Sequence, residues 1–217
     1  MIFHQTRAVI FDLDGTLLDT LTDLMNAVNH ALSVNGFPCR TREEVRRFVG
    51  NGLEKLVERA LPDGRSTPSF SDVLAETRRF YAEHCRENTA PYAGIPEMLR
   101  ALQQKGILLG VVSNKPDAQV KTLCQSEFGD LITVASGASE GIRMKPAPDT
   151  LLACMEALGS ATENTVYVGD SDVDIQTAAN AGIPCVSVLW GFRDREFLTV
   201  AGAGIFAQSP CEICRFF

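Results

Sequence analysis

The sequence predicts an α/β fold: a doubly wound, Rossmann-like parallel sheet into which an all-α helical bundle is inserted. A short apolar run at 9–11 ends in polar residues, as a buried strand does. Residues 19–88 then read as one helix after another. From residue 91 onward, helical segments alternate with short apolar runs, which is typical of a parallel sheet with helices on both faces. The sheet domain is therefore expected to comprise residues 1–18 and 89–217, and the helical domain residues 19–88.

The composition limits the classes of function. The chain has 217 residues, of which 45% are hydrophobic, and a formal net charge of −7. A negative balance disfavours nucleic acids and anionic membranes as partners, because both attract positive surfaces. The sequence has no long apolar run of membrane-spanning length, and its first residues lack the basic and apolar parts of a signal peptide. We expect a cytoplasmic protein, monomeric or homodimeric, that acts on a small molecule.

The seven cysteines do not predict a disulfide framework. Five of them are scattered through apolar or helical contexts, as reduced thiols in a protein core are. Cys211 and Cys214 are spaced Cys-x-x-Cys, which could serve redox or metal chemistry, but no second pair accompanies them. Helix packing is the favoured interpretation of this pair.

The first strand is expected to place two carboxylates at its carboxyl end. Asp12 and Asp14 follow the apolar run directly, and Gly15 and Thr16 come after them. Open α/β sheets bind ligands at the carboxyl ends of their strands, and an unpaired carboxylate is too costly to bury in a core. Two carboxylates this close together indicate a bound cation, a shifted pKa, or both. The alternative is a plain Asx-type turn.

The inserted region divides into helices separated by turn signals. An apolar stripe at helical spacing over 21–32 predicts the first helix. The sequence Thr41-Arg42-Glu43-Glu44 is a capping box that begins the second. A glycine-rich break at 50–52 precedes the third, and a loop at 61–71 precedes a last helix that ends at about residue 87.

The second part of the chain alternates helices and strands, and glycines close several of the helices. A last short strand is expected at 204–206, and residues 211–217 are few for a closing helix. Phe216 and Phe217 are expected to pack on the core or at an interface. In chain order we expect helix 96–105, strand 107–112, helix 117–126, a weaker strand 131–135, helix 149–158, strand 165–168, helix 173–181 and strand 184–189.

Polar residues follow two of these strands and fill a loop between them. Ser113 and Asn114 follow one strand, Asp170 and Asp174 follow another, and Lys145 lies in the intervening loop. Because carboxyl ends of parallel strands share one edge, these side chains should meet the two aspartates of the first strand. Singly, each has an ordinary alternative, such as a helix cap or a solvated charge. Together they offer carboxylates for a divalent cation, donors for anionic oxygens and one cation, which suits phosphoryl transfer.

In these motifs the chain resembles the haloacid dehalogenase superfamily of phosphatases, over essentially its whole length. The family pattern Asp-x-Asp-Gly-Thr is present as residues 12–16, the Ser/Thr motif as Ser113-Asn114, the lysine motif as Lys145-Pro146, and the acidic motif as Gly169-Asp170 with Asp174. The helical insertion resembles the family's first cap type. The stretches 49–52 and 58–61 resemble the phosphoglycolate phosphatase subgroup. The resemblance implies Mg²⁺-dependent hydrolysis of a small phosphate monoester, with 2-phosphoglycolate as the expected substrate.

The resemblance also implies the catalytic roles. Asp12 would be the nucleophile that forms an aspartyl-phosphate, and Asp14 would be the general acid and then the general base. A carboxylate oxygen of Asp12, the backbone carbonyl of Asp14 and the carboxylate of Asp170 would hold Mg²⁺. Asp174 would lie behind these ligands and orient Lys145 or a metal-bound water.

The same resemblance implies a phosphate-binding set. Ser113, Asn114 and Lys145 would bind the phosphoryl oxygens. Thr16 would support the orientation of Asp14 within the same site.

The helical domain would act as a lid that closes over the site and excludes water. Gly50 and Asn51 are expected to reach the substrate from this lid, where backbone N–H groups would contact its leaving group. The alternative is a plain loop between helices, because Gly-Asn-Gly is a common turn sequence.

Other functions of the same fold stay open at this point. A sugar-phosphate mutase would carry the same motifs and transfer the phosphoryl group to a sugar hydroxyl. A non-catalytic binding protein would have lost a motif residue, and none is lost. A phosphonate-cleaving relative would need a cap lysine for a Schiff base, and the context of Lys55 gives that role no support. Dehalogenation is disfavoured, because Asp14 with Asp170 suits metal-dependent phosphoryl transfer.

Overall fold

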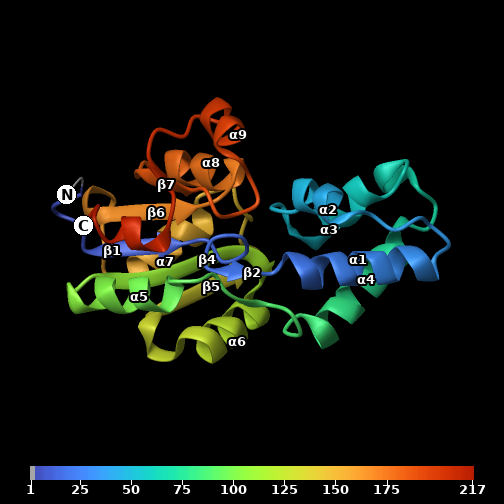
Figure 1. The fold of residues 1–217 in the computed structure, drawn as a ribbon, viewed down its shortest axis with the longest axis horizontal. Helices are drawn as coiled ribbons and strands as arrows, with labels where there is room; N and C mark the ends of the chain where they lie inside the picture. The colour runs from blue at the N-terminus through green and yellow to red at the C-terminus, as the bar shows by residue number, and fades with distance from the viewer. Residues whose placement is uncertain (1–2) are drawn as a thin grey trace. The chain divides into compact units, whose positions relative to one another are not determined.

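The computed structural model describes residues 3–217, and they form two compact units (Figure 1). One unit comprises Met1–Leu18 and Pro91–Phe217 and contains the sheet; the other, Asp19–Ala90, is helical. Two short strands, β2 (Leu18–Asp19) and β3 (Ala90–Pro91), pair where the chain passes between the units. Within residues 3–217, no helix has the length and apolar character needed to cross a membrane.

The sheet has six strands in the order β5-β4-β1-β6-β7-β8, and all neighbouring pairs are parallel. The central strand β1 ends at Phe11, which lies opposite Val111 of β4 and Val168 of β6. The residues that follow these three strands therefore share one edge of the sheet. The strands are β1 (Ala8–Phe11), β4 (Leu108–Pro116), β5 (Val134–Ala138), β6 (Thr165–Gly169), β7 (Cys185–Val188) and β8 (Phe206–Ala207).

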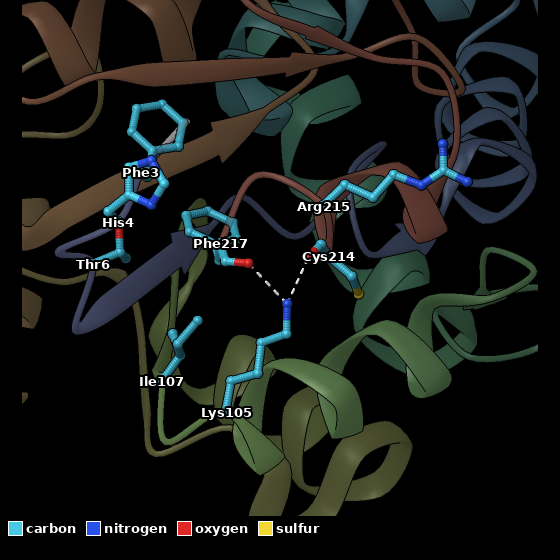
Figure 2. A pocket seen from close by; sticks show the side chains of 8 residues that line it. All are labelled: Phe3, His4, Thr6, Lys105, Ile107, Cys214, Arg215 and Phe217. Atoms are coloured by element: carbon cyan, nitrogen blue, oxygen red, sulfur yellow. Dashed lines mark hydrogen bonds between the residues drawn. The ribbon is translucent and has the colours of Figure 1, made fainter. Parts of the chain in front are cut away.

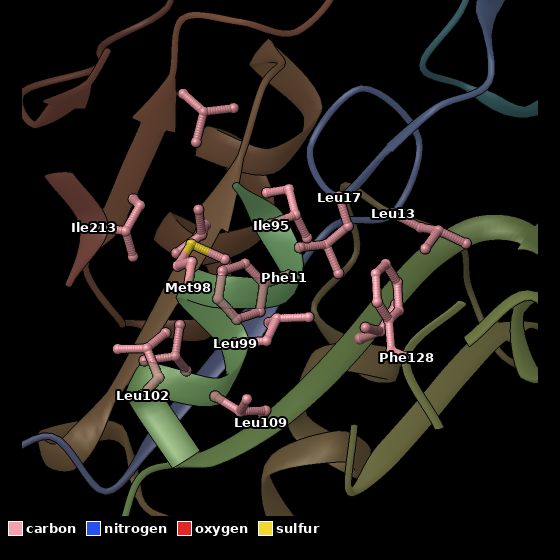
Figure 3. Close-up of a cluster of buried hydrophobic side chains, with 14 of the residues drawn as sticks. Phe11, Leu13, Leu17, Ile95, Met98, Leu99, Leu102, Leu109, Phe128 and Ile213 are labelled. Atoms are coloured by element: carbon pink, nitrogen blue, oxygen red, sulfur yellow. The ribbon is translucent and has the colours of Figure 1, made fainter. Parts of the chain in front are cut away.

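Helices cover both faces of this sheet. Successive side chains of a strand point to opposite faces, so an apolar strand has two apolar faces to bury. Val9 and Phe11 of β1 are fully buried with the apolar sides of α5, α6 and α10 (Figure 3). Ala8 and Ile10 are equally buried with α7 and α8 on the other face. The predicted doubly wound α/β class is thereby confirmed. The helices of this unit are α5 (Ile95–Gln104), α6 (Asp117–Phe128), α7 (Asp149–Ala157), α8 (Asp172–Ala181), α9 (Arg195–Val200) and α10 (Pro210–Ile213).

Several elements differ from the sequence-based expectation, among them β8, which lies at Phe206–Ala207 and not at 204–206. Strand β4 continues through the polar motif to Pro116, where we expected it to end at 112. Strand β5 begins three residues later than expected, because a 3₁₀ turn at Gly129–Leu131 follows α6. Helix α9 was not expected. The aromatic pair that ends the chain, Phe216 and Phe217, packs on the core and not on an exposed surface.

The helical unit contains α1 (Leu21–Val34), α2 (Arg42–Phe48), α3 (Gly52–Ala60) and α4 (Phe70–His84). The predicted capping box is present: the Thr41 side chain accepts from the Glu44 N–H, and the Glu44 carboxylate accepts from the Thr41 N–H. Near the start of α1, the buried carboxylate of Asp23 accepts from the backbone N–H groups of Asn88 and Thr89 and from both their side chains. This contact ties the first helix to the segment in which the unit ends.

Candidate active site

The carboxyl end of β1 brings two aspartates into a tight turn. The Asp12 N–H continues the ladder to the Val168 carbonyl at 2.9 Å, and its side chain is buried. Gly15 turns the chain with a φ of +86°, a conformation that side chains other than glycine rarely adopt. A Cβ at Gly15 would also come within 2.5 Å of an Asp170 carboxylate oxygen. The glycine of the motif is therefore required by both its backbone angle and its close approach to Asp170.

The Lys145 ammonium group lies buried among three acceptors. Its Nζ donates to Asp12 Oδ1 at 2.8 Å, to Asp174 Oδ1 at 2.7 Å and to the Tyr167 hydroxyl at 3.0 Å. An ammonium group has three N–H donors, so all of them are used. Burial alone would lower the pKa of Lys145, but the nearby carboxylates of Asp12 and Asp174 outweigh it and hold the pKa above its usual value. Lys145 is therefore a fixed cation next to Asp12.

Three buried carboxylates form a potential metal site. Oxygens of Asp12, Asp170 and Asp174 lie within 4.8 Å of one another. Burial raises the pKa of Asp12 well above its usual value, against the opposing effect of Lys145. Burial and the charge of Asp174 raise the pKa of Asp170 to about 7.

The charge of the site fits a divalent cation. The carboxylates of Asp12 and Asp174 pair with the Lys145 ammonium group, that of Asp14 pairs with Lys115, and the charge of Arg193 acts on Asp170. With every group ionised, the negative charge is in excess, and oxygen ligands of this kind suit hard cations such as Mg²⁺. Asp174 is the least available ligand of the set, because its oxygens also accept from Ser171 N at 3.1 Å and Ser171 Oγ at 2.6 Å.

Asp170 is held from two sides. Its Oδ1 accepts from the Thr16 hydroxyl at 3.2 Å, and its Oδ2 accepts from the Phe192 N–H at 2.7 Å. The fully buried Thr16 hydroxyl therefore contacts Asp170, whereas we expected Thr16 to support the orientation of Asp14. The connection joins the turn after β1 to the turn after β6.

Asp14 is paired with a lysine that sequence reasoning missed. Lys115 Nζ lies 2.8 Å from Asp14 Oδ1, and the Ser113 hydroxyl lies 3.4 Å from Asp14 Oδ2. The Lys115 side chain is only 3% exposed. Its position in β4, two residues after Ser113, puts it on the same side of the strand as Ser113. The alternation of side chains along a strand could have predicted this position of Lys115, but only if β4 had been known to continue past residue 112.

The phosphate-binding role expected of Asn114 stays a prediction, and its side chain has another partner. Its Oδ1 accepts from the Lys145 N–H at 2.8 Å, and its Nδ2 donates to the Lys145 carbonyl at 3.0 Å. The side chain is therefore engaged with the lysine loop and does not point a free amide at a phosphate. Tyr167 is a second residue that sequence reasoning missed, since its place in an apolar strand marked it as core.

In the helical unit, Gly50 and Asn51 lie between α2 and α3. Gly50 has a φ of +115°, and Asn51 is the residue that precedes the first turn of α3. Asn51 Oδ1 accepts from Arg59 Nη2 at 2.9 Å, and Arg59 Nη1 also donates to the Phe48 carbonyl at 2.6 Å. The loop therefore has a defined conformation of its own.

A cavity of about 550 Å³ lies at the other edge of the sheet (Figure 2). Its lining includes Ile107, just before β4, and Lys105, whose Nζ donates to the carbonyls of Cys214 at 2.7 Å and Phe217 at 2.8 Å. This cavity is remote from the carboxylates, because strands β1 and β4 begin near it and the aspartates follow their far ends.

Comparison with known proteins decides the family. Residues 9–188 match the model of the haloacid dehalogenase-like hydrolases. The chain belongs to this family. A phosphoglycolate phosphatase from Escherichia coli is 34% identical to it over 95% of this chain and 90% of the relative, and one from Pseudomonas putida is 37% identical over 94% of this chain and 74% of the relative.

A solved structure agrees. The crystal structure of a protein from Lactobacillus delbrueckii subsp. bulgaricus, provisionally described as a phosphoglycolate phosphatase, superposes with a TM-score of 0.93 at 35% identity, covering 97% of this chain and 98% of the other. The resemblance read from the motifs is confirmed, and so is the expected class of enzyme, a phosphoric monoester hydrolase of this family.

Proposed function

We propose that this haloacid dehalogenase-like hydrolase is a Mg²⁺-dependent phosphatase of small phosphate monoesters, with 2-phosphoglycolate as its substrate. One observation carries the reaction type: Asp12, at the end of the central strand, lies 2.8 Å from the buried Lys145 ammonium group inside a cluster with excess negative charge. An anionic nucleophile beside a fixed cation is what attack on an anionic phosphoryl group requires.

In the first step, an Asp12 carboxylate oxygen forms a bond to phosphorus as the ester P–O bond breaks, and Asp14 gives a proton to the leaving alkoxide. In the second step, Asp14 takes a proton from water as the water oxygen attacks phosphorus and releases Asp12. Lys145 and Ser113 would bind phosphoryl oxygens, and Lys145 would give up its contact with Asp12 to do so. Asp174 and Tyr167 keep Lys145 in place through their contacts at 2.7 and 3.0 Å.

Mg²⁺ would be held by the carboxylates of Asp12 and Asp170 and by the backbone carbonyl of Asp14. When bound, it neutralises charge on the phosphoryl group and on the carboxylates around it. Asp174 would orient Lys145 and would not bind Mg²⁺ directly, because Lys145 and Ser171 already donate to its oxygens.

The helical unit would supply substrate selection. We assign it the role of a lid, with backbone N–H groups of Gly50 and Asn51 contacting the leaving group. The choice of 2-phosphoglycolate is supported by the names of relatives that are 34% and 37% identical over nearly the whole chain. The seven free thiols fit a reducing compartment, so we place the enzyme in the cytoplasm.

The test is phosphate release from 2-phosphoglycolate, sugar phosphates, nucleotides and pyrophosphate, each with Mg²⁺ or with EDTA. We expect Mg²⁺-dependent turnover with the highest kcat/KM for 2-phosphoglycolate, and none for Asp12→Asn. A preference for another ester would contradict 2-phosphoglycolate as the substrate but would still support the phosphatase reaction. Phosphoryl transfer to a sugar hydroxyl without phosphate release would indicate the mutase, and no turnover of any ester would contradict the proposal.

A further inference from the structure

A three-residue segment after β7, Trp190-Gly191-Phe192, contacts both parts of the candidate metal site. The Trp190 indole Nε1 donates to the Thr16 carbonyl at 2.9 Å, and the Phe192 N–H donates to Asp170 Oδ2 at 2.7 Å. The partners lie 174 and 22 residues away in the sequence. We call these three residues the 190–192 segment.

Gly191 is held between the two parts of the site with no room for a side chain. A Cβ there would come within 2.5 Å of the Gly15 carbonyl oxygen and 2.6 Å of Asp170 Oδ2. Its φ lies outside the left-handed region, so close approach and not backbone angle requires a glycine. The backbone of the segment therefore lies in close contact with Asp170 and with the turn that follows Asp14.

Together with Thr16, the segment closes a ring of hydrogen bonds. Trp190 holds the Thr16 carbonyl, the Thr16 hydroxyl holds Asp170 Oδ1 at 3.2 Å, and Phe192 holds Asp170 Oδ2. With one donor on each oxygen, the Asp170 carboxylate cannot rotate without breaking a buried hydrogen bond. Such a break leaves an unsatisfied polar group and is costly.

We propose that the 190–192 segment is the positioning element that fixes the Asp170 carboxylate against the turn after β1, and that it thereby sets the affinity of the site for a divalent cation. The cation itself rests on the proposed function; the positioning rests on the contacts above. Outer partners of this kind change metal affinity by about 10- to 100-fold when they are removed.

The test measures metal binding without substrate, by calorimetric titration of the purified protein with Mg²⁺ and with Mn²⁺. Gly191→Ala is the main variant, and Gly204→Ala is its matched control, because a Cβ at Gly204 meets no atom within 4 Å. We expect Gly191→Ala to raise the Kd for Mg²⁺ by about 10-fold or more. Gly204→Ala should bind as the parent does.

A second variant tests the same claim if Gly191→Ala fails to fold. Trp190→Phe keeps the ring and removes the indole N–H, and it should also raise the Kd, by a smaller factor. Trp190 is the single tryptophan of the sequence, so its fluorescence in the parent protein should change on Mg²⁺ saturation, and Asp170→Asn should abolish that change.

The outcomes separate the two proposals. Folded Gly191→Ala or Trp190→Phe protein with the parent's Kd would overturn the positioning role, even if the parent binds Mg²⁺ and hydrolyses phosphate esters. A parent protein that binds neither Mg²⁺ nor Mn²⁺ would overturn the cation site in the proposed function and this inference with it.

Discussion

The side-chain amide of Asn114 holds the backbone of Lys145 at both its N–H and its carbonyl group, at 2.8 and 3.0 Å. The two residues are 31 positions apart, in β4 and in the loop before α7. This double contact fixes the loop from which the Lys145 side chain reaches Asp12. Asn114 therefore acts on the candidate site through Lys145.

Asn114→Ala should weaken both stability and catalysis. Two buried backbone groups lose their partners, which costs about 2–4 kcal/mol in the free energy of unfolding. A displaced Lys145 should lower kcat/KM by about 100-fold. Asn180→Ala is the control, because the exposed Asn180 donates to the Pro146 carbonyl of the same loop at 2.9 Å. Parent-like activity of Asn114→Ala in steady-state assays would contradict this role.

Lys115→Met should lower kcat through Asp14. The substitution removes the ammonium group that lies 2.8 Å from Asp14 Oδ1 and keeps most of the side-chain volume. Without it, the carboxylate expected to move protons loses the contact that orients it, and we expect a loss in kcat of about 100-fold. Lys121→Met is the matched control, since its ammonium group pairs with Asp117 at an exposed position. Equal kcat values for the two variants would show that the pair has no part in catalysis.

Asp170→Asn should stabilise the metal-free protein at high pH. Because burial raises the pKa of Asp170 to about 7, the folded state holds this proton more tightly than the unfolded state does. Its contribution to stability is present below the ordinary pKa near 4 and is lost as the pH rises through 7. In EDTA, the variant should unfold at a higher temperature than the parent at pH 8, and at a similar temperature at pH 4.

Mg²⁺ should reverse that order at pH 8. Binding to the folded parent raises its unfolding temperature, whereas the variant lacks the ligand oxygen. Thermal unfolding at pH 4 and pH 8, with EDTA or Mg²⁺, measures both effects. A parent protein that is more stable than Asp170→Asn in EDTA at pH 8 would contradict the assigned pKa shift.

Asp23→Ala should destabilise the helical unit. The buried Asp23 carboxylate accepts from Asn88 and Thr89 through backbone and side-chain donors, at 2.8 to 3.1 Å. Its loss leaves several donors without a partner and should cost about 3 kcal/mol or more in denaturant unfolding. Asp63→Ala is the control, because Asp63 is exposed and caps no helix with its side chain. Equal effects would show that solvent replaces the Asp23 contacts.

The elements that carry the site motifs could be predicted because their sequence signals are local. The apolar run before Asp12 and the glycine after α8 each describe their own element. The boundary of β5 could not be predicted, because residues 131–135 are as apolar as a strand. Only the turn at Gly129–Leu131 moves its start to Val134.

The partners of site residues were less predictable than their positions. Lys145 and the acidic cluster follow from strand order, because they share one edge of the sheet. The hydroxyl of Thr16 meets Asp170, 154 residues away, and the backbone of Phe192 completes the contact. Such pairings depend on where distant turns come together, which a single sequence does not encode locally. The 190–192 segment was missed for this reason.

The most direct test of the proposed mechanism is to trap the phosphoryl group covalently on Asp12. Asp14→Asn removes the base that activates water, so it should slow release of an intermediate formed from an aryl phosphate, whose leaving group needs no proton from Asp14. After acid quenching with a labelled phosphate ester and Mg²⁺, mass spectrometry should find one phosphoryl group on the peptide that contains Asp12. Turnover by the parent enzyme with no phosphoryl group on Asp12 at any quench time, or turnover by Asp12→Asn, would contradict the central claim.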